Sequence, residues 1–241
     1  FPTDLYVAEG LERMLGKSRC TLELRSPKDL VAAMNEEVAV LMLSHVNFRD
    51  GSVHDVADLT RIAHEKDILV LWDLAHSAGV LSITVDEWDV DFAVGCGYKY
   101  LNGGPGAPSF LYVNKRLHDQ FLQPLVGWMG HEKPFQFEQK FVPARGIRQF
   151  ISGTPHILSL VALDSALEIF QDLDIDSLQE KASALSGYFL ELVLKESDLD
   201  EFQLVSPNDP SKRGAQLSFS HPSAYAISRA WIAEGVIADF R

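Results

Sequence analysis

The sequence predicts an α/β protein with a mostly parallel sheet and helices on both of its faces. Short apolar runs that resemble buried strands alternate with longer segments in which apolar residues recur at helical spacing. This alternation is typical of parallel sheets built from strand–helix–strand units. The chain has 241 residues, 46% of them hydrophobic, which is enough for one large core and a small appended domain.

The first part of the chain supplies the predicted sheet. Strands are expected at 21–24, 38–43, 68–72, 92–94 and 109–113. Helices are expected at 4–15, at 27–34 with Ser26 as its cap, and at 53–66. In the last of these, the apolar residues Val53, Val56, Leu59 and Ala63 follow helical spacing.

From Pro155 onward the pattern changes. Two long helices are expected at 157–171 and 178–195, followed by a polar connection at 197–213 with a short strand at 203–205. A strand at 216–220 and a helix at 224–234 come next. We therefore predict a large domain at 1–173 and the start of a small α+β domain at 174–241. Both are expected to be incomplete, since the chain opens without methionine and stops at 236–241 in what resembles a strand.

Composition excludes several classes of partner. The net charge of −13 argues against nucleic acid and against an anionic membrane surface. No apolar run has transmembrane length, and no signal peptide is visible. The two cysteines, Cys20 and Cys96, have no metal-ligand spacing, so no metal site is predicted and a cytoplasmic location is expected.

Lys99 stands where a chemically active lysine is expected. It follows an apolar run, Phe92-Ala93-Val94, and precedes a loop with three glycines. Burial lowers the pKa of an amine, and a neutral amine can condense with a carbonyl group. The plainer interpretation is a strand-end lysine with its ammonium group in water.

Asp73 favours the chemical interpretation of Lys99. It ends the apolar run at 68–72, and a carboxylate at the carboxyl end of a parallel strand lies where open α/β sheets bind ligands. Pyridoxal phosphate requires a lysine that holds it as a Schiff base and a carboxylate that keeps its pyridine nitrogen protonated. Asp73 alone would also suit a helix cap or a turn.

Six segments carry a resemblance to a known family. They are FPTDLY at 1–6, SHVN at 44–47, WDLAHSAG at 72–79, YKYLNGGPG at 98–106, GWMGH at 127–131 and the pair Gly153-Thr154. These segments resemble kynureninase, a family of fold type I pyridoxal phosphate enzymes in the aminotransferase class V group. The resemblance extends over the whole chain, and the segments at 1–6 and 127–131 are its most specific parts.

The resemblance implies which residues contact the cofactor. They are Phe1, Pro2, Thr3, Asp4, Ser44, Asp73, His76, Tyr98, Lys99, Trp128 and Thr154. Phe1 would stack on the pyridine ring, Asp4 would hold the polar edge of the ring, and Ser44 would contact the cofactor. Trp128 and Thr154 would reach the phosphate from a neighbouring subunit, which implies a homodimer with shared active sites.

Further residues have both functional and structural interpretations. His76 is expected to donate a hydrogen bond to Asp73, although a histidine near a strand end is often purely structural. Phe1 would also suit core packing, Asp4 a helix cap, Ser44 a turn and Tyr98 amphipathic packing. His131 and Asn47 are candidates for contact with the substrate.

The implied activity is hydrolysis of L-kynurenine or 3-hydroxy-L-kynurenine to an anthranilate and L-alanine, in tryptophan catabolism or NAD biosynthesis. Lys99, Tyr98 and Asp73 would be the catalytic residues. The alternatives are a cysteine desulfurase or selenocysteine lyase, a class V aminotransferase, or an inactive fragment. A desulfurase needs a nucleophilic cysteine late in its chain, and no cysteine follows Cys96 here.

The family also uses residues beyond these segments. An earlier segment contacts the phosphate, and a later arginine binds the substrate carboxylate. Arg241 comes just before the region where that arginine is expected. The isolated stretch 1–241 is therefore expected to bind the cofactor poorly and to turn over little.

Overall fold

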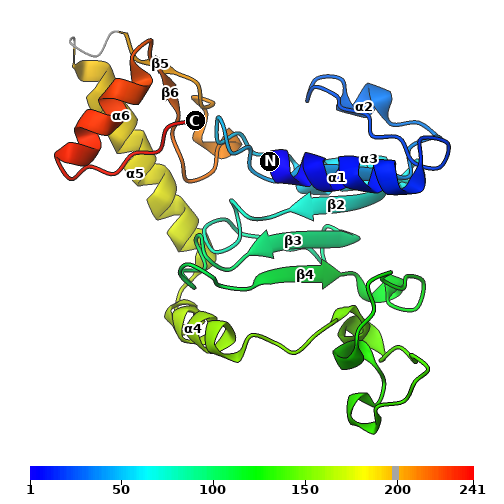
Figure 1. Cartoon of the computed structure of the whole chain (residues 1–241). Helices are drawn as coiled ribbons and strands as arrows, with labels where there is room; N and C mark the ends of the chain where they lie inside the picture. Colours follow the sequence, from blue (N-terminus) through cyan, green and yellow to red (C-terminus); the bar gives the residue numbers. More distant parts are fainter. Residues whose placement is uncertain (197–200) are drawn as a thin grey trace.

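The computed structural model describes residues 1–196 and 201–241. Its central sheet has the order β1 (Val40–Ser44), β2 (Leu69–Asp73), β3 (Phe92–Cys96) and β4 (Ser109–Val113) (Figure 1). The first three strands pair in parallel, and β4 pairs with β3 in the antiparallel sense. The prediction of an α/β fold with a mostly parallel sheet is confirmed.

The core lies between the sheet and α3 (Val56–His64). Along β2, Val70 and Trp72 are buried while their neighbours on the other face are only half-buried. Val56 and Ala63 of α3 join the same cluster. The indole N–H of Trp72 donates to Thr60 Oγ1 at 3.2 Å, so the polar edge of this large side chain is satisfied inside the core.

The N-terminal segments differ from the prediction. Helix α1 (Pro2–Leu15) forms, but the expected strand at 21–24 is wrong. The backbone N–H of Leu22 donates to Glu12 Oε1 of α1 at 3.0 Å, so it is bonded to a helix side chain and not to a sheet edge. The helix expected at 27–34 is reduced to α2 (Leu30–Ala33), a single turn.

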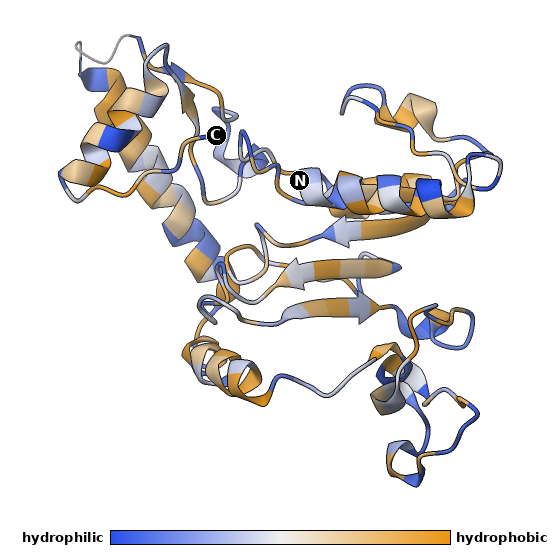
Figure 2. Ribbon diagram, viewed as in Figure 1, coloured by the Kyte–Doolittle hydropathy of each residue, from blue (hydrophilic) through white to orange (hydrophobic). Residues whose placement is uncertain are grey.

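After β4 the chain forms short 3₁₀ segments and then two long helices. The 3₁₀ segments are η1 (Lys115–Leu117), η2 (Trp128–Gly130), η3 (Pro134–Gln136) and η4 (Gly146–Phe150). Helix α4 (Ile157–Leu167) continues into η5 (Glu168–Phe170), and α5 (Ile175–Lys195) begins at its cap Asp174. Helix α4 is strongly hydrophobic (Figure 2), yet none of its residues is buried.

The C-terminal elements gather beside α5 (Figure 1). They are β5 (Gln203–Leu204), η7 (Pro210–Lys212), β6 (Phe219–Ser220) and α6 (Ala224–Ala233). The segment after η7 is bonded to the loop that follows β1. Residues 197–200, where the expected connection begins, lie outside the described residues. The domain boundary expected near 173 falls just before α5 and stays a prediction.

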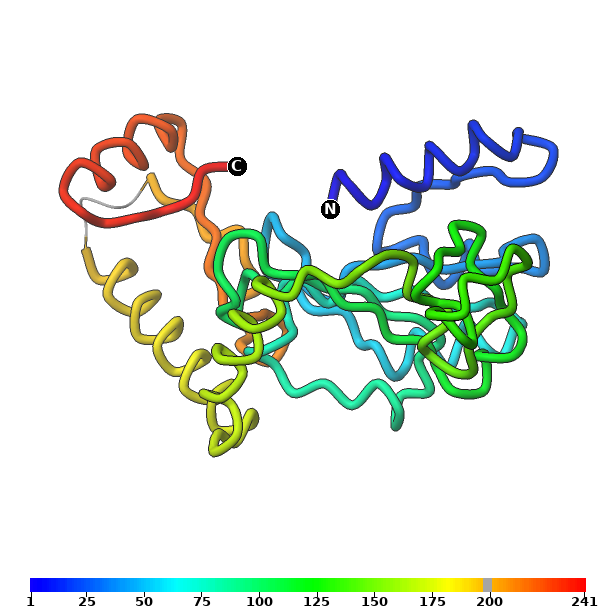
Figure 3. The backbone as a smooth tube through the Cα atoms, turned by 60° about the horizontal axis from the view of Figure 1, so that its bottom comes forward, coloured from blue at the N-terminus to red at the C-terminus, as the bar shows by residue number. Residues whose placement is uncertain are grey.

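The strand expected at 236–241 is wrong. This segment has no regular structure and runs back toward the start of the chain, so that both termini lie near the same edge of the sheet (Figures 1 and 3). There a guanidinium N–H of Arg241 donates to the Phe48 carbonyl oxygen. The segment is therefore held by a side-chain contact and not by strand pairing.

A buried carboxylate fixes the end of the sheet where β2 and β3 begin. Asp91, fully buried just before β3, accepts from the Val70 N–H at 2.7 Å and from His64 Nε2 at 2.9 Å. It also pairs with the guanidinium of Arg116. The carboxylate thus joins β2, α3 and the segment after β4. An asparagine here would keep one acceptor oxygen but would place an N–H donor where the carboxylate now accepts from His64 or Arg116.

Replacing Asp91 with asparagine should therefore destabilise the protein by about 3 kcal/mol, because hydrogen bonds to a buried charged group are lost, measured as the free energy of unfolding in urea. Asp89→Asn is the matched control, since Asp89 also faces His64 and Arg116 but is 59% exposed. It should cost less than about 1 kcal/mol, because exposed ion pairs contribute little. Equal losses in the two variants would contradict a structural role for the buried carboxylate.

Candidate active site

Three strand ends meet at one edge of the sheet. Ser44, the last residue of β1, lies opposite Asp73, the last residue of β2, and Asp73 lies opposite Val94 of β3. Lys99 follows the end of β3 by three residues. The parallel pairing therefore brings the hydroxyl, the carboxylate and the amine to the same edge, as the sequence predicted.

Asp73 is half-buried, and burial raises the pKa of its carboxyl group. The charge of Asp4 also raises this pKa. In the opposite direction, the Ala75 N–H donates to Asp73 Oδ1 at 2.8 Å, and the positive charges of Lys99 and of the first nitrogen of the chain lower the pKa. The Ser44 hydroxyl lies 3.4 Å from Asp73 Oδ2. Lys99 is thus close enough for its charge to act on the carboxylate.

Lys99 lies in a tightly folded loop. The Asn102 N–H donates to the Lys99 carbonyl oxygen at 2.9 Å, and the Gly103 N–H donates to the Gly97 carbonyl oxygen at 2.9 Å. The Lys99 side chain is half-buried, with Nζ 5.7 Å from the centre of the Tyr98 ring. Tyr98 is 53% exposed, so the phenol is open to a ligand at this edge.

His76 lies close to this cluster but does not bond to Asp73 as expected. Asp73 instead accepts from the Ala75 N–H and faces the Ser44 hydroxyl. Burial, followed by the charges of Lys99 and Arg241, lowers the pKa of His76 to about 4. A neutral imidazole beside the lysine is therefore the form present near pH 7.

The first residues of the chain lie at the same edge. The backbone nitrogen of Phe1 lies 3.0 Å from Asp4 Oδ2 and 3.3 Å from the Ser44 hydroxyl. The Phe1 ring meets the Phe48 ring edge-on, with 5.0 Å between centroids. Pro2 and Thr3 begin α1, and Asp4 lies in its first turn. The structure thus brings the expected N-terminal residues to the strand ends.

Trp128 and Thr154 are not brought to these strand ends. Because β4 is antiparallel, it ends at the opposite side of the sheet, and the chain around Trp128 lies beyond that side (Figure 1). Trp128 is 40% exposed and packs against Phe135 and Phe137 instead. Thr154 is exposed in the segment that leads to α4.

His131 and Asn47 make local contacts. His131 is buried, with Nε2 3.1 Å from the Lys140 carbonyl oxygen, while Nδ1 accepts from the Lys133 N–H at 2.9 Å. Both ring nitrogens are therefore used within its own loop. Asn47 Oδ1 accepts from the Arg49 N–H at 3.0 Å, which is a turn contact.

Sequence reasoning missed the approach of Arg241 to this edge. Its guanidinium carbon lies 5.5 Å from the centre of the Phe48 ring, and its charge acts on His76 and Tyr100. Asp239 pairs with Arg241 at 2.8 Å. The contact joins segments 193 residues apart, so no local pattern signals it.

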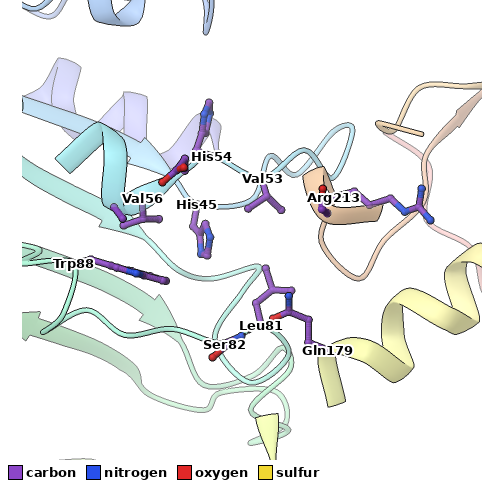
Figure 4. A pocket seen from close by; sticks show the side chains of 12 residues that line it. His45, Val53, His54, Val56, Leu81, Ser82, Trp88, Gln179 and Arg213 are labelled. Atoms are coloured by element: carbon purple, nitrogen blue, oxygen red, sulfur yellow. Dashed lines mark hydrogen bonds between the residues drawn. The ribbon is translucent and has the colours of Figure 1, made fainter. Parts of the chain in front are cut away.

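A separate cavity of about 180 Å³ lies between the sheet and α5 (Figure 4). His45, Val56, Trp88, Leu81 and Gln179 are among its lining residues. His45 is 5% exposed, and its buried Nδ1 has no hydrogen-bond partner among the described residues. Burial, followed by the charge of His54, lowers the pKa of His45 to about 4. The residues lining this cavity do not include Lys99 or Asp73.

The sequence profile described as Aminotransferase class-V matches residues 20–230. The chain is 44% identical over 241 residues to a protein named kynureninase from Pseudomonas fluorescens, covering 100% of this chain and 58% of that protein. A kynureninase from Deinococcus radiodurans is also 44% identical, over 243 residues, with the same two coverages. The resemblance to kynureninase expected from the motifs is confirmed.

Solved structures support the fold. A mutant of C-DES with glycine covalently linked to its PLP cofactor has a TM-score of 0.74 at 20% identity, covering 92% of this chain and 58% of that one. The apo cysteine desulfurase from Thermococcus onnurineus has a TM-score of 0.71 at 21% identity, covering 87% of this chain and 51% of that one.

The fold, together with the polar residues at its strand ends, indicates an α/β protein. Proteins of this class bind ligands at the carboxyl ends of their parallel strands. The chain belongs to the aminotransferase class-V family. It spans 58% of the length of the curated relatives it matches. Among the described residues, no helix is both long and apolar enough to cross a membrane, and no group of three or more potential ligands is arranged to hold a metal.

The buried histidine makes the stability of the protein depend on pH. Because the pKa of His45 is lowered on folding, the unfolded state binds more protons between pH 6.5 and about 4. Stability should thus fall as pH falls through this window, with up to about 3 kcal/mol due to His45. Urea unfolding at several pH values should show a shallower dependence for His45→Gln. His156→Gln, at an exposed histidine, should keep the wild-type dependence. An unchanged slope in His45→Gln would refute the assignment.

Proposed function

We propose that this chain belongs to an enzyme that hydrolyses L-kynurenine or 3-hydroxy-L-kynurenine to an anthranilate and L-alanine with pyridoxal phosphate. The reaction belongs to tryptophan catabolism or NAD biosynthesis. One observation carries the proposal: Lys99 and Asp73 lie at neighbouring strand ends on one sheet edge. The identity of 44% to proteins named kynureninase gives the substrate class.

The residues at this edge fit pyridoxal phosphate. The cofactor needs an amine for its aldehyde and an acid for its pyridine nitrogen, and both are present. A structural relative, the C-DES mutant described above, carries a PLP cofactor. Phe1, Asp4, Ser44 and His76 surround the same edge and would hold the ring.

When bound, pyridoxal phosphate supplies a ring that withdraws electrons from the substrate carbons. Asp73 would hold a proton on the pyridine nitrogen, and the Ala75 N–H together with the charge of Lys99 favours the ionised form of Asp73. Lys99 would hold the cofactor through its amine and, as a free amine, would take the proton from the substrate Cα. Tyr98 moves protons while water adds to the γ-carbonyl and the Cβ–Cγ bond breaks.

A homodimer with shared sites is part of the proposal. Trp128 and Thr154 would donate to the phosphate of the partner subunit, because an indole N–H and a hydroxyl are suitable donors. Exposed apolar side chains support a second copy as the partner: Leu158 is 87% exposed, Phe137 75% and Phe135 73%. We also propose a cytoplasmic location, because Cys20 and Cys96 are free thiols and thiols stay reduced in that compartment.

A cysteine desulfurase is the second candidate, favoured by the structural likeness to such an enzyme. Against it stands the 44% identity to proteins named kynureninase, compared with 21% identity to the desulfurase. A selenocysteine lyase or an aminotransferase would also use a lysine and an aspartate at these positions, so Lys99 and Asp73 do not distinguish these activities. Anthranilate fluorescence, release of sulfur or selenium, and keto-acid formation separate these activities in the full-length protein.

Replacing Lys99 with alanine in the full-length protein should remove the visible absorbance of lysine-bound pyridoxal phosphate. It should also lower kcat for anthranilate release by at least about 10³-fold, because the group that takes the Cα proton is lost. Lys181→Ala, at an exposed lysine of α5, is the control and should keep both signals. A Lys99→Ala protein that retains the absorbance would refute the role of Lys99.

Mixing two inactive variants tests the shared site. If Trp128 acts on the partner's phosphate, a dimer of one Lys99→Ala chain and one Trp128→Ala chain has one site with both native residues. Random exchange of subunits should then restore about a quarter of the wild-type activity. If Trp128 acts within its own chain, each site lacks one residue and mixing restores nothing.

A further inference from the structure

The backbone of Gly79 is pressed against the backbone of Tyr100. Gly79 has φ +95°, and a Cβ built there would lie 2.8 Å from both the carbonyl carbon and the oxygen of Tyr100. It would also lie 3.1 Å from Leu101 Cδ2. Real Cβ contacts this short do not occur with backbone atoms, so only glycine fits without a shift. The contact joins the turn that starts at Asp73 to the loop that holds Lys99.

The turn on the Asp73 side is firmly held. The Leu74 N–H donates to the Val94 carbonyl oxygen of β3 at 2.8 Å, and the Ala78 N–H donates to the Leu74 carbonyl oxygen at 2.9 Å. Ser77 is fully buried, and its carbonyl oxygen accepts from the Leu81 N–H at 2.9 Å. Gly79 therefore has little freedom to withdraw from Tyr100.

The loop on the Lys99 side is held by its own backbone. The Asn102 N–H donates to the Lys99 carbonyl oxygen and the Gly103 N–H donates to the Gly97 carbonyl oxygen, and these two hydrogen bonds close the loop. Asn102 takes a left-handed conformation with φ 60°. A Cβ at Gly97 would lie 2.7 Å from the Pro108 carbonyl oxygen, so this part of the loop is closely packed as well. Because the loop is closed in this way, a displacement of the Tyr100 backbone should also displace the neighbouring Lys99.

We propose that Gly79 is a positioning residue that sets the separation between the Lys99 amine and the Asp73 carboxylate. The inference rests on the proposed function, in which one cofactor ring lies between these groups. A methyl group at position 79 must displace the Tyr100 backbone by several tenths of an ångström to reach ordinary contact distance. Displacements of about 1 Å at a catalytic group lower rates by about 10²-fold.

The test compares Gly79→Ala with Gly16→Ala in the full-length protein. Gly16 has φ +82°, similar to Gly79, but a Cβ there meets nothing within 4 Å. Both variants carry the backbone strain of alanine at positive φ, and only Gly79→Ala carries the contact with Tyr100. The measurements are the dissociation constant of pyridoxal phosphate from the apo protein, kcat and KM for kynurenine, and unfolding in urea.

Gly79→Ala should bind pyridoxal phosphate about 10-fold more weakly and have kcat about 10- to 100-fold lower, with KM changed less than about threefold. Gly16→Ala should match the wild type in cofactor affinity, kcat and KM. If Gly79→Ala has the same cofactor affinity, kcat and KM as Gly16→Ala, the positioning role is refuted.

If Gly79→Ala does not fold, Asn102→Gly replaces it. Glycine keeps the left-handed conformation but frees the Lys99 loop, so cofactor affinity and kcat should both fall, by about threefold or more. Unchanged values would refute the proposal. A wild-type protein that neither binds pyridoxal phosphate nor releases anthranilate would refute the proposed function itself, before any variant is made.

Discussion

The parallel register of β1, β2 and β3 is the constraint on which the rest of the site depends. It sets Ser44 opposite Asp73 and Asp73 opposite Val94. The polar residues at the ends of the three strands therefore lie along one edge of the sheet. Side chains alternate along a strand, so a slip of one residue in β2 would exchange the faces of Trp72 and Asp73. Burial of Trp72 against α3 therefore also holds Asp73 on the side where it can meet a ligand.

The two ends of the sheet use carboxylates in different ways. At one end Asp91 is fully buried and bonded to a backbone N–H, a histidine and an arginine, so its polar atoms are satisfied by the fold. At the other end Asp73 has one short bond, from Ala75, and a longer contact with Ser44. Burial raises the pKa of Asp73, and a carboxyl group with a shifted pKa at strand ends is typical of functional sites.

The sequence was sufficient for the parts of the fold that depend on local pattern. Buried strands such as β3 and the strand-end residues Asp73 and Lys99 were predicted, because apolar runs and their polar ends are local signals. The strand expected at 21–24 does not form because its backbone is bonded to a side chain of α1, a tertiary contact that no local pattern encodes. The approach of Arg241 to Phe48 and of Gly79 to Tyr100 depends on tertiary packing alone.

The single chain brings together only part of the predicted site. Phe1, Asp4, Ser44, Asp73 and Lys99 share one edge, whereas the antiparallel turn of β4 carries Trp128 to the other side of the sheet. The segment that contains Trp128 leads on to α4, whose apolar side chains are exposed within the described residues. An apolar helix without a buried residue gains stability only when another surface covers it. In the proposed dimer, a second copy would both cover the exposed apolar side chains of α4 and receive Trp128 and Thr154.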